Sequence, residues 1–238
     1  MRFAAHTTTL AATLTLALGG CSAIPSDTTQ QAGQLHGVWV VFLSAAAVVY
    51  ALVAGLIMWS VLAYRRRDPA TVQAAKFHQN VPLELAWTVI PVLVVAGLFA
   101  VTYAGERHVD SVVTPPGETV QVVGFRWSWR FLYPREHIAI DGTSDRPPEL
   151  VLPANRTTEI RLSSSDVIHA FWVPAFLFKR DAIPGIVNVF DYTPLKEGVY
   201  PGHCAEYCGT FHAHMSFTVR VVSPEAFARW ARERGAPA

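Results

Sequence analysis

The segment GHCAEYCGTFHAHM, residues 202–215, concentrates potential metal ligands. Its fourteen residues include two cysteines, three histidines, a glutamate and a methionine, although the whole chain has only three cysteines and three methionines. Thiolate, thioether and imidazole groups are the ligands that copper and zinc take from proteins. The segment therefore predicts a metal site that draws on several of these side chains.

Four kinds of chemistry use such residues. Two nearby cysteines could form a disulfide in an oxidising compartment, but a disulfide leaves the other ligands unused. Structural zinc accepts Cys and His but has little use for methionine. One blue copper ion takes two His, one Cys and a weak axial Met, which leaves the second thiolate without a role. Two thiolates can instead bridge two copper ions, each with its own His. The segment offers Cys204, Cys208, His212 and Met215 to such a pair.

A pair of copper ions needs a second histidine from elsewhere in the chain. His169, in SDVIHAFWVP, is the best candidate, because it lies on a predicted strand just after a turn. Within the segment, a strand would place His212 and His214 on the same face, so periodicity does not choose between them.

The N-terminus indicates export from the cytoplasm. Residues 1–20 have an early arginine, a short apolar stretch and small residues before Cys21, which is typical of a secretory signal peptide. The sequence LGGC resembles a bacterial lipobox, so we expect Cys21 to be acylated after cleavage; the alternative is an ordinary signal peptide with a chance cysteine. Residues 21–36 would then form an N-terminal extracytoplasmic segment.

Two apolar stretches predict a transmembrane hairpin within residues 37–104. Residues 38–64 carry no charge, and a helix of this length reaches ~40 Å, more than the ~30 Å hydrocarbon core. Residues 85–103 form a second span, in which Pro91 should introduce a kink. The arginines at 65–67 and Lys76 lie between the spans and mark the cytoplasmic side. Both ends of the hairpin are then extracytoplasmic, as expected for a multi-pass protein of the cell membrane.

The remaining chain changes to short β-rich segments. Six or more of them, separated by Gly, Pro, Asn and Asp, predict an antiparallel sandwich or barrel over residues 105–222. One of them, GFRWSWRF, alternates so strictly that a single strand should place Trp127 and Trp129 on one face. Ser223 can cap a C-terminal helix within residues 223–238. The net charge of +1 argues against nucleic acid as a partner.

These motifs together carry a family resemblance. HCAEYCGTFHAHM, with VIHAFWVPAF, KRDAIPG and ELAWTVIP, resembles subunit II of haem–copper cytochrome c oxidase of the bacterial aa3 type over roughly residues 35–222. The resemblance implies a two-helix transmembrane hairpin followed by an all-β, cupredoxin-like Greek-key sandwich or barrel and a short C-terminal helix. It also implies a dinuclear copper centre, CuA. The ligands that the resemblance gives are His169, Cys204, the backbone carbonyl of Glu206, Cys208, His212 and Met215. His203 and His214 match no ligand of the family.

The resemblance also implies an activity. A separate c-type cytochrome would give electrons to the copper centre, and haem in subunit I would receive them for reduction of dioxygen to water, coupled to proton translocation. Other oxidase subunits and the lipid bilayer are further expected partners. No catalytic residue is expected in this chain. Because the chain lacks a C-x-x-C-H motif, the cytochrome donor must be another molecule.

Other residues acquire roles only through the resemblance. Trp127, the first tryptophan of W-x-W, is where electrons would enter, although Ser128 stands where relatives often have an aromatic residue. The Glu206 side chain would reach a magnesium ion shared with subunit I, or else be solvated. Glu84 would mark a proton uptake path, or else favour its helix dipole. Asp181 and Pro184 would contact subunit I, or simply form a turn.

Three rival functions fit the sequence less well. A quinol oxidase subunit keeps the fold without copper and should lack Cys204 and Cys208. Nitrous oxide reductase shares the copper loop but needs a large propeller domain and no helical hairpin. A copper-delivery protein needs clusters of exposed methionine or cysteine, and three methionines are too few.

Overall fold

A computed structural model of the chain describes residues 28–65 and 79–235, which divide into two units. One unit comprises residues 37–108. The other comprises residues 28–36 together with 109–235. The predicted signal peptide, the acylation site at Cys21 and the basic residue Lys76 lie outside the described residues.

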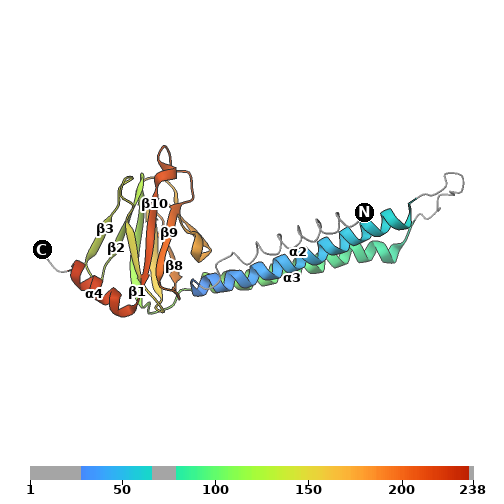
Figure 1. Cartoon of the computed structure of the whole chain (residues 1–238), viewed down its shortest axis with the longest axis horizontal. Helices are drawn as coiled ribbons and strands as arrows, with labels where there is room; N and C mark the ends of the chain where they lie inside the picture. The colour runs from blue at the N-terminus through green and yellow to red at the C-terminus, as the bar shows by residue number, and fades with distance from the viewer. Residues whose placement is uncertain (1–27, 66–78, 236–238) are drawn as a thin grey trace, which may run out of the picture. The chain divides into compact units, whose positions relative to one another are not determined.

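Two long apolar helices dominate the first unit (Figure 1). Helix α2 spans Gln30–Ala63 and helix α3 spans Val81–Val109, with mean hydropathies of 2.6 and 2.3 over their most apolar stretches. Both are long enough to cross a membrane, and their apolar side chains are exposed. A Cβ atom added at Gly105 would lie 2.9 Å from Cγ2 of Val38, so the helices touch at this point. The two predicted spans are therefore present as a helical pair.

Ten strands build the second unit as two five-stranded sheets (Figure 1). The first sheet has the order β3-β2-β1-β5-β8 and the second has the order β4-β10-β9-β6-β7. The strands of the first sheet are β1 (Glu118–Phe125), β2 (Ser128–Tyr133), β3 (Ile138–Asp141), β5 (Thr158–Ser164) and β8 (Asn188–Tyr192). Those of the second are β4 (Glu149–Pro153), β6 (His169–Val173), β7 (Phe178–Ala182), β9 (Gly198–Cys204) and β10 (Ser216–Val222).

The sandwich is mixed, not purely antiparallel as predicted. Strand β1 pairs in parallel with β5, and β10 pairs in parallel with β4, while the other pairs are antiparallel. Each parallel pair joins strands that are not consecutive, because the chain passes to the other sheet between them. Alternation within a strand specifies which face is buried but carries no information on the direction of its neighbour.

The aromatic segment at residues 124–131 is a hairpin and not the single strand that its alternation predicts. Phe125 pairs with Ser128, so Arg126 and Trp127 form the turn between β1 and β2. Trp129 is still fully buried, as an inward position on β2 should be. Trp127 is only partly buried and lies at the end of the sandwich. Period-two alternation continued through a two-residue turn and concealed it.

Aromatic rings fill the space between the sheets. Phe171 of β6 stacks on Phe217 of β10 at a centroid distance of 4.4 Å, and the edge of Trp129 contacts both rings. The predicted C-terminal helix is present as α4 (Pro224–Gly235), capped by Ser223 Oγ, which accepts from the Ala226 N–H at 3.2 Å. This core is rigid and places the ends of β6, β9 and β10 beside one another.

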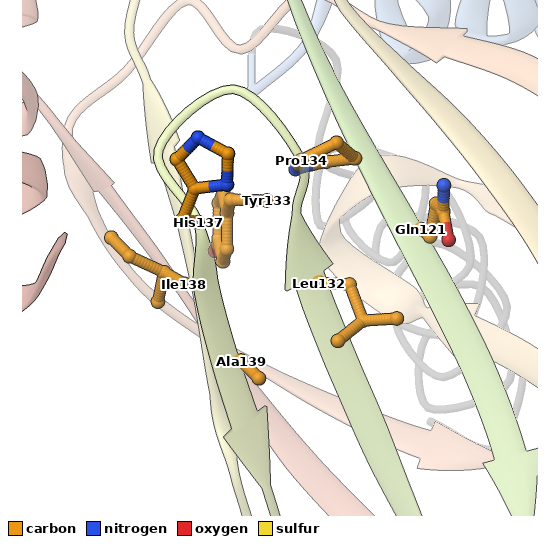
Figure 2. A pocket seen from close by; sticks show the side chains of 7 residues that line it. All are labelled: Gln121, Leu132, Tyr133, Pro134, His137, Ile138 and Ala139. Carbon is orange, nitrogen blue, oxygen red and sulfur yellow. The ribbon is translucent and has the colours of Figure 1, made fainter.

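A shallow pocket lies away from the predicted ligands. It is formed where β1, β2 and β3 meet, and Figure 2 shows Pro134 and His137 at the turn above Leu132 and Ala139. This is the end of the β1–β2 hairpin opposite to the turn that carries Trp127. None of the predicted site residues lines the pocket, so it is not part of the predicted metal site.

Candidate metal centre

Strand pairing brings the predicted ligands together at one end of the second sheet. Strands β6 and β9 are neighbours, with Phe171 opposite Cys204, and the Ala205 N–H donates to the Ala170 carbonyl at 3.0 Å. The loop after β9 closes on itself where the Cys204 N–H donates to the Met215 carbonyl at 2.9 Å. The start of β6, the end of β9 and the residue before β10 therefore meet. These positions are His169, Cys204 and Met215.

The sulfur atoms form a compact, solvent-shielded group. Sγ of Cys204 and Sγ of Cys208 lie 3.9 Å apart, and both thiols are free. The Cys208 sulfur is 3.7 Å from Sδ of Met215, and the Cys204 sulfur is 3.2 Å from the Glu206 carbonyl oxygen. The cysteines are 7% and 6% exposed and Met215 is 1% exposed. Two thiols, a thioether and a carbonyl thus face one buried volume.

His169 stands beside the first cysteine. Its Nδ1 lies 3.8 Å from the Cys204 sulfur, and its ring is fully buried against the edge of Trp129. A Cβ atom at Gly124 would lie 3.0 Å from the imidazole Cδ2, so any larger residue there would press on the ring. On the opposite ring nitrogen, Nε2 lies 2.9 Å from Oδ1 of Asp166.

His212, and not His214, reaches the second cysteine. The two histidines lie on a short 3-10 helix, η4 (His212–His214), and not on a strand, so they do not share a face. Nδ1 of His212 is 3.5 Å from the Cys208 sulfur. His214 is exposed, and its ring contacts Phe211. His203 is also exposed and packs near Trp172 on the outer face of the sheet.

Trp127 lies at the rim of this group. Its indole Nε1 donates to the Cys208 carbonyl at 3.1 Å, and its ring contacts Phe211 edge-on at 5.1 Å. Gly209 has φ +116°, and a Cβ atom there would meet the indole Nε1 at 3.2 Å. The glycine thus provides both the backbone conformation and the space for the indole. The side chain of Trp127 is therefore hydrogen-bonded directly to the loop that carries both cysteines.

The ionisable ligands influence one another. Burial raises the pKa of the Cys204 thiol, but hydrogen bonds with His169 and the backbone outweigh burial and lower it. Burial and the nearby Cys204 charge raise the pKa of Cys208. Burial lowers the pKa of His169, but hydrogen bonds with Cys204 and Asp166 outweigh that effect and raise it. The Cys204 thiol therefore ionises more readily than the Cys208 thiol.

The remaining predicted residues lie apart from the sulfurs. The backbone carbonyl of Glu206 faces the Cys204 sulfur, but its side chain is exposed, so the carboxylate lies outside the sulfur group. Asp181 is half-buried on β7 opposite Ala170, next to the strand of His169, and Pro184 is exposed in the following loop. Glu84 lies in the first turn of α3, where its Oε1 accepts from the Asn80 N–H at 3.4 Å.

Sequence reasoning missed two residues of this site. Asp166 bonds to His169, and Phe211 covers one edge of Trp127. An acidic residue three positions before a candidate histidine ligand, in a polar turn, is a signal that could have identified Asp166. No sequence signal distinguishes Phe211 from a core aromatic.

Comparisons with known proteins identify the family of the chain. Residues 142–222 match the family described as cytochrome c oxidase subunit II, periplasmic domain, and residues 21–102 match the transmembrane domain of the same subunit. The chain is 35% identical to a probable cytochrome c oxidase subunit 2 of Nocardia farcinica, over 89% of this chain and 74% of the relative. It is also 35% identical to the corresponding protein of Streptomyces coelicolor, over 86% and 76%.

Solved structures include a similar domain. The periplasmic domain of subunit II of cytochrome oxidase from Bradyrhizobium japonicum is 34% identical, with a TM-score of 0.48, and the match covers 52% of this chain and 96% of that one.

Proposed function

The chain belongs to the cytochrome c oxidase subunit II family, and from this premise we propose that it is the electron-input subunit of a terminal oxidase. It accepts electrons from a c-type cytochrome at a dinuclear copper centre and passes them to haem in subunit I. There dioxygen is reduced to water, coupled to proton translocation. The observation that carries this proposal is the pair of free, buried thiols with one imidazole nitrogen beside each sulfur.

The residues present fit copper. Cys204 and Cys208 would bridge two copper ions, and the other ligands would be His169, His212, Met215 and the carbonyl of Glu206. Soft sulfur ligands with imidazole favour copper, whereas structural zinc leaves a thioether unused. The near symmetry of the group supports two metals: each sulfur has a histidine nitrogen within 3.8 Å and a weaker ligand within 3.7 Å. When bound, the copper pair would supply a one-electron redox couple shared between the metals.

The protein shields most of this ligand set from water, while His212 is half-buried at its edge. His169, Cys204, Cys208 and Met215 are all buried, and Phe171, which stacks on Phe217, pairs with Cys204 across the sheet. His169 and Cys204 are fixed at strand ends, and the loop that carries Cys208 and His212 is closed by the hydrogen bond between Cys204 and Met215. Ligands held in this way should move little between redox states, which favours rapid electron transfer. Trp127 joins the site to the partly exposed rim through its bond to the Cys208 carbonyl, so we assign to it the point where electrons enter.

The exposed carboxylate of Glu206 supports a further ligand role. Its carbonyl faces the Cys204 sulfur while its side chain points into solvent, so one residue can serve two metals. Carboxylate oxygens suit magnesium, and we propose that Glu206 reaches such an ion at the contact with subunit I. Asp181 and Pro184, on the edge next to His169, form part of the same contact.

The membrane unit completes the proposal. The chain is a membrane protein with a C-terminal periplasmic domain. We propose that it lies in the cell membrane with both ends of its hairpin outside, and that Cys21 carries a lipid after removal of residues 1–20. Glu84 would mark the start of a proton path on the cytoplasmic side. Its bond to Asn80 at the helix start is compatible with that role and also caps α3.

Metal analysis of the detergent-purified chain tests the proposal. We expect two copper atoms per chain, with the seven-line spin-resonance pattern that one unpaired electron gives when two equivalent copper nuclei share it. A four-line signal with one copper atom would replace the dinuclear centre by a mononuclear one. Zinc as the bound metal, or a Cys204–Cys208 disulfide in the metal-replete chain, would overturn the proposal.

A further inference from the structure

One carboxylate, that of Asp166, joins two parts of the site that are distant in sequence. Its Oδ1 lies 2.9 Å from Nε2 of His169 and accepts from the Val167 N–H at 2.6 Å. Its Oδ2 accepts from the backbone N–H of Arg126 at 2.7 Å, and the Arg126 Nε lies 3.4 Å from the same oxygen. The two oxygens thus face a proposed metal ligand on one side and the turn that carries Trp127 on the other.

The first contact orients the ligand ring. With Nε2–H donating to Asp166, the lone pair of the imidazole is on Nδ1, the nitrogen that faces the Cys204 sulfur. Histidine ligands commonly donate their second nitrogen to a carboxylate in this way, which sets both tautomer and ring orientation. Packing against Trp129 and the backbone of Gly124 limits the tilt of the ring but does not choose its tautomer.

The second contact holds the hairpin turn. Arg126 is the first residue of the turn between β1 and β2, and its N–H is directed away from the ladder to Asp166. The next residue, Trp127, donates its indole N–H to the Cys208 carbonyl. The bonds therefore run from His169 through Asp166 and the turn to Cys208, linking one side of the ligand group to the other.

The segment around Asp166 is itself well anchored. The Ser165 N–H donates to the Gly124 carbonyl at 3.0 Å, and Ser164 Oγ donates to the Val167 carbonyl while it accepts from the Asp166 N–H. The carboxylate is only 22% exposed. A side chain fixed in this way can impose its geometry on its partners, rather than follow theirs.

We infer that Asp166 is a positioning residue that sets the ring of His169 and the indole of Trp127 together. The position of His169, a proposed copper ligand, is thereby fixed relative to that of Trp127, the proposed point of electron entry. This inference rests on the proposed function, since both partners take their roles from it. It adds a residue to which no role was assigned from the sequence.

Two substitutions of Asp166 test its contacts with His169 and Arg126, and a control variant detects a general loss of fold. Asp166→Ala removes both acceptors. Asp166→Asn keeps the size of the side chain but offers one acceptor oxygen and one NH2 donor, so it cannot accept from both His169 and Arg126. The matched control is Asp141→Asn, because Asp141 forms an exposed ion pair with Arg130 on the adjacent β2–β3 pair and touches no ligand.

The first measurement is made on the copper-loaded, detergent-purified chain. We expect both Asp166 variants to lose copper at about ten- to a hundred-fold lower chelator concentration than the unaltered chain, as for other carboxylate partners of histidine ligands. We also expect an altered nitrogen hyperfine coupling for one histidine ligand. Asp141→Asn should match the unaltered chain in both. Unchanged copper loss and unchanged coupling in Asp166→Asn would overturn the inference.

The second measurement tests the link to Trp127. Electron input from a reduced c-type cytochrome is followed for Trp127→Phe, Asp166→Asn and the double variant. If Asp166 acts on this step through Trp127, adding Asp166→Asn to Trp127→Phe should slow electron input by a much smaller factor than Asp166→Asn slows it in the unaltered chain. Fully additive slowing would overturn this half of the inference. An unaltered chain that binds no copper pair would instead remove the proposed function, so the two failures are distinguishable.

Discussion

The Sγ atoms of Cys204 and Cys208 lie 3.9 Å apart as free thiols, in a loop that a β-sandwich holds closed. A disulfide requires its sulfurs at about 2.05 Å, so the loop keeps them apart by nearly twice that distance. Separate sulfurs with an imidazole nitrogen beside each one fit the dinuclear metal site that we propose.

Replacing one thiol should remove the paired site without unfolding the domain. We expect Cys208→Ser to lower copper from two atoms per chain to one or none and to abolish the seven-line pattern. Far-ultraviolet circular dichroism should be unchanged, because Cys208 lies in the loop between β9 and β10. Thr210→Ser, at an exposed position in the same loop, serves as the control. A retained two-copper spectrum in Cys208→Ser would exclude bridging by this sulfur.

The two neighbouring histidines should differ sharply. His212→Asn removes the nitrogen 3.5 Å from the Cys208 sulfur, whereas His214→Asn changes an exposed side chain two residues away. We expect His212→Asn to alter the visible and spin-resonance spectra and to weaken copper binding, and His214→Asn to leave both unchanged. Equal effects of the two substitutions would mean that His212 is not the ligand.

Trp127 should govern electron input. Trp127→Phe keeps an aromatic ring but removes the N–H that donates to the Cys208 carbonyl. We expect electron transfer from a c-type cytochrome, measured by stopped-flow absorbance, to slow severalfold while copper content stays at two. The matched variant is Trp172→Phe, on the outer face of β6, which should transfer electrons at the normal rate. Equal rates in both variants would remove Trp127 from the path.

Glu84 offers a test of proton uptake against helix capping. Glu84→Gln keeps an oxygen that can accept from the Asn80 N–H, so the start of α3 should remain intact. We expect oxygen reduction by the assembled oxidase to slow, with no change in the copper spectrum. Glu106→Gln, exposed near the other end of α3, should turn over normally. Normal turnover in Glu84→Gln would leave capping as its only role.

Replacing each of two buried tyrosines should affect the stability of the fold differently. The Tyr133 hydroxyl donates to the Val151 carbonyl at 3.0 Å and accepts from its N–H at 2.8 Å. Tyr133→Phe should therefore cost about 1–3 kcal/mol of unfolding free energy. The Tyr192 hydroxyl is buried and has no hydrogen-bond partner among the described residues, so Tyr192→Phe should leave the free energy of unfolding unchanged or raise it. Denaturant unfolding followed by near-ultraviolet circular dichroism measures both.

The same tyrosines predict a loss of stability in alkali. Burial is the main cause that raises the pKa of both hydroxyls above the unfolded value of about 10. The folded state therefore keeps its protons where the unfolded state loses them, so stability is full below pH ~10 and falls as the pH rises above it. Each Tyr→Phe variant should reduce this fall. An unchanged pH profile in both variants would show that other groups cause it.

Much of the protein was determined by local sequence. The apolar stretches at residues 38–64 and 85–103 specify helices because their length and composition leave few alternatives, and both helices are present. The pattern of ligand types in residues 202–215 predicted a metal site, because soft ligands are rare and rarely cluster without one. These features depend on residues close together in the chain.

Other features depend on contacts between segments that are distant in the sequence, and only the tertiary structure shows them. Alternation around Trp127 looked like one strand, and only its pairing across the sheet revealed the turn. Local periodicity did not distinguish His212 from His214, and only the family resemblance pointed to His212. The short helix η4, in the loop that returns from Cys204 to Met215, is what brings His212 to the Cys208 sulfur. The bond from Asp166 to Arg126 joins residues forty positions apart. No local pattern encodes such a bond, because it exists only once β1 and β5 have paired in parallel and brought their ends together.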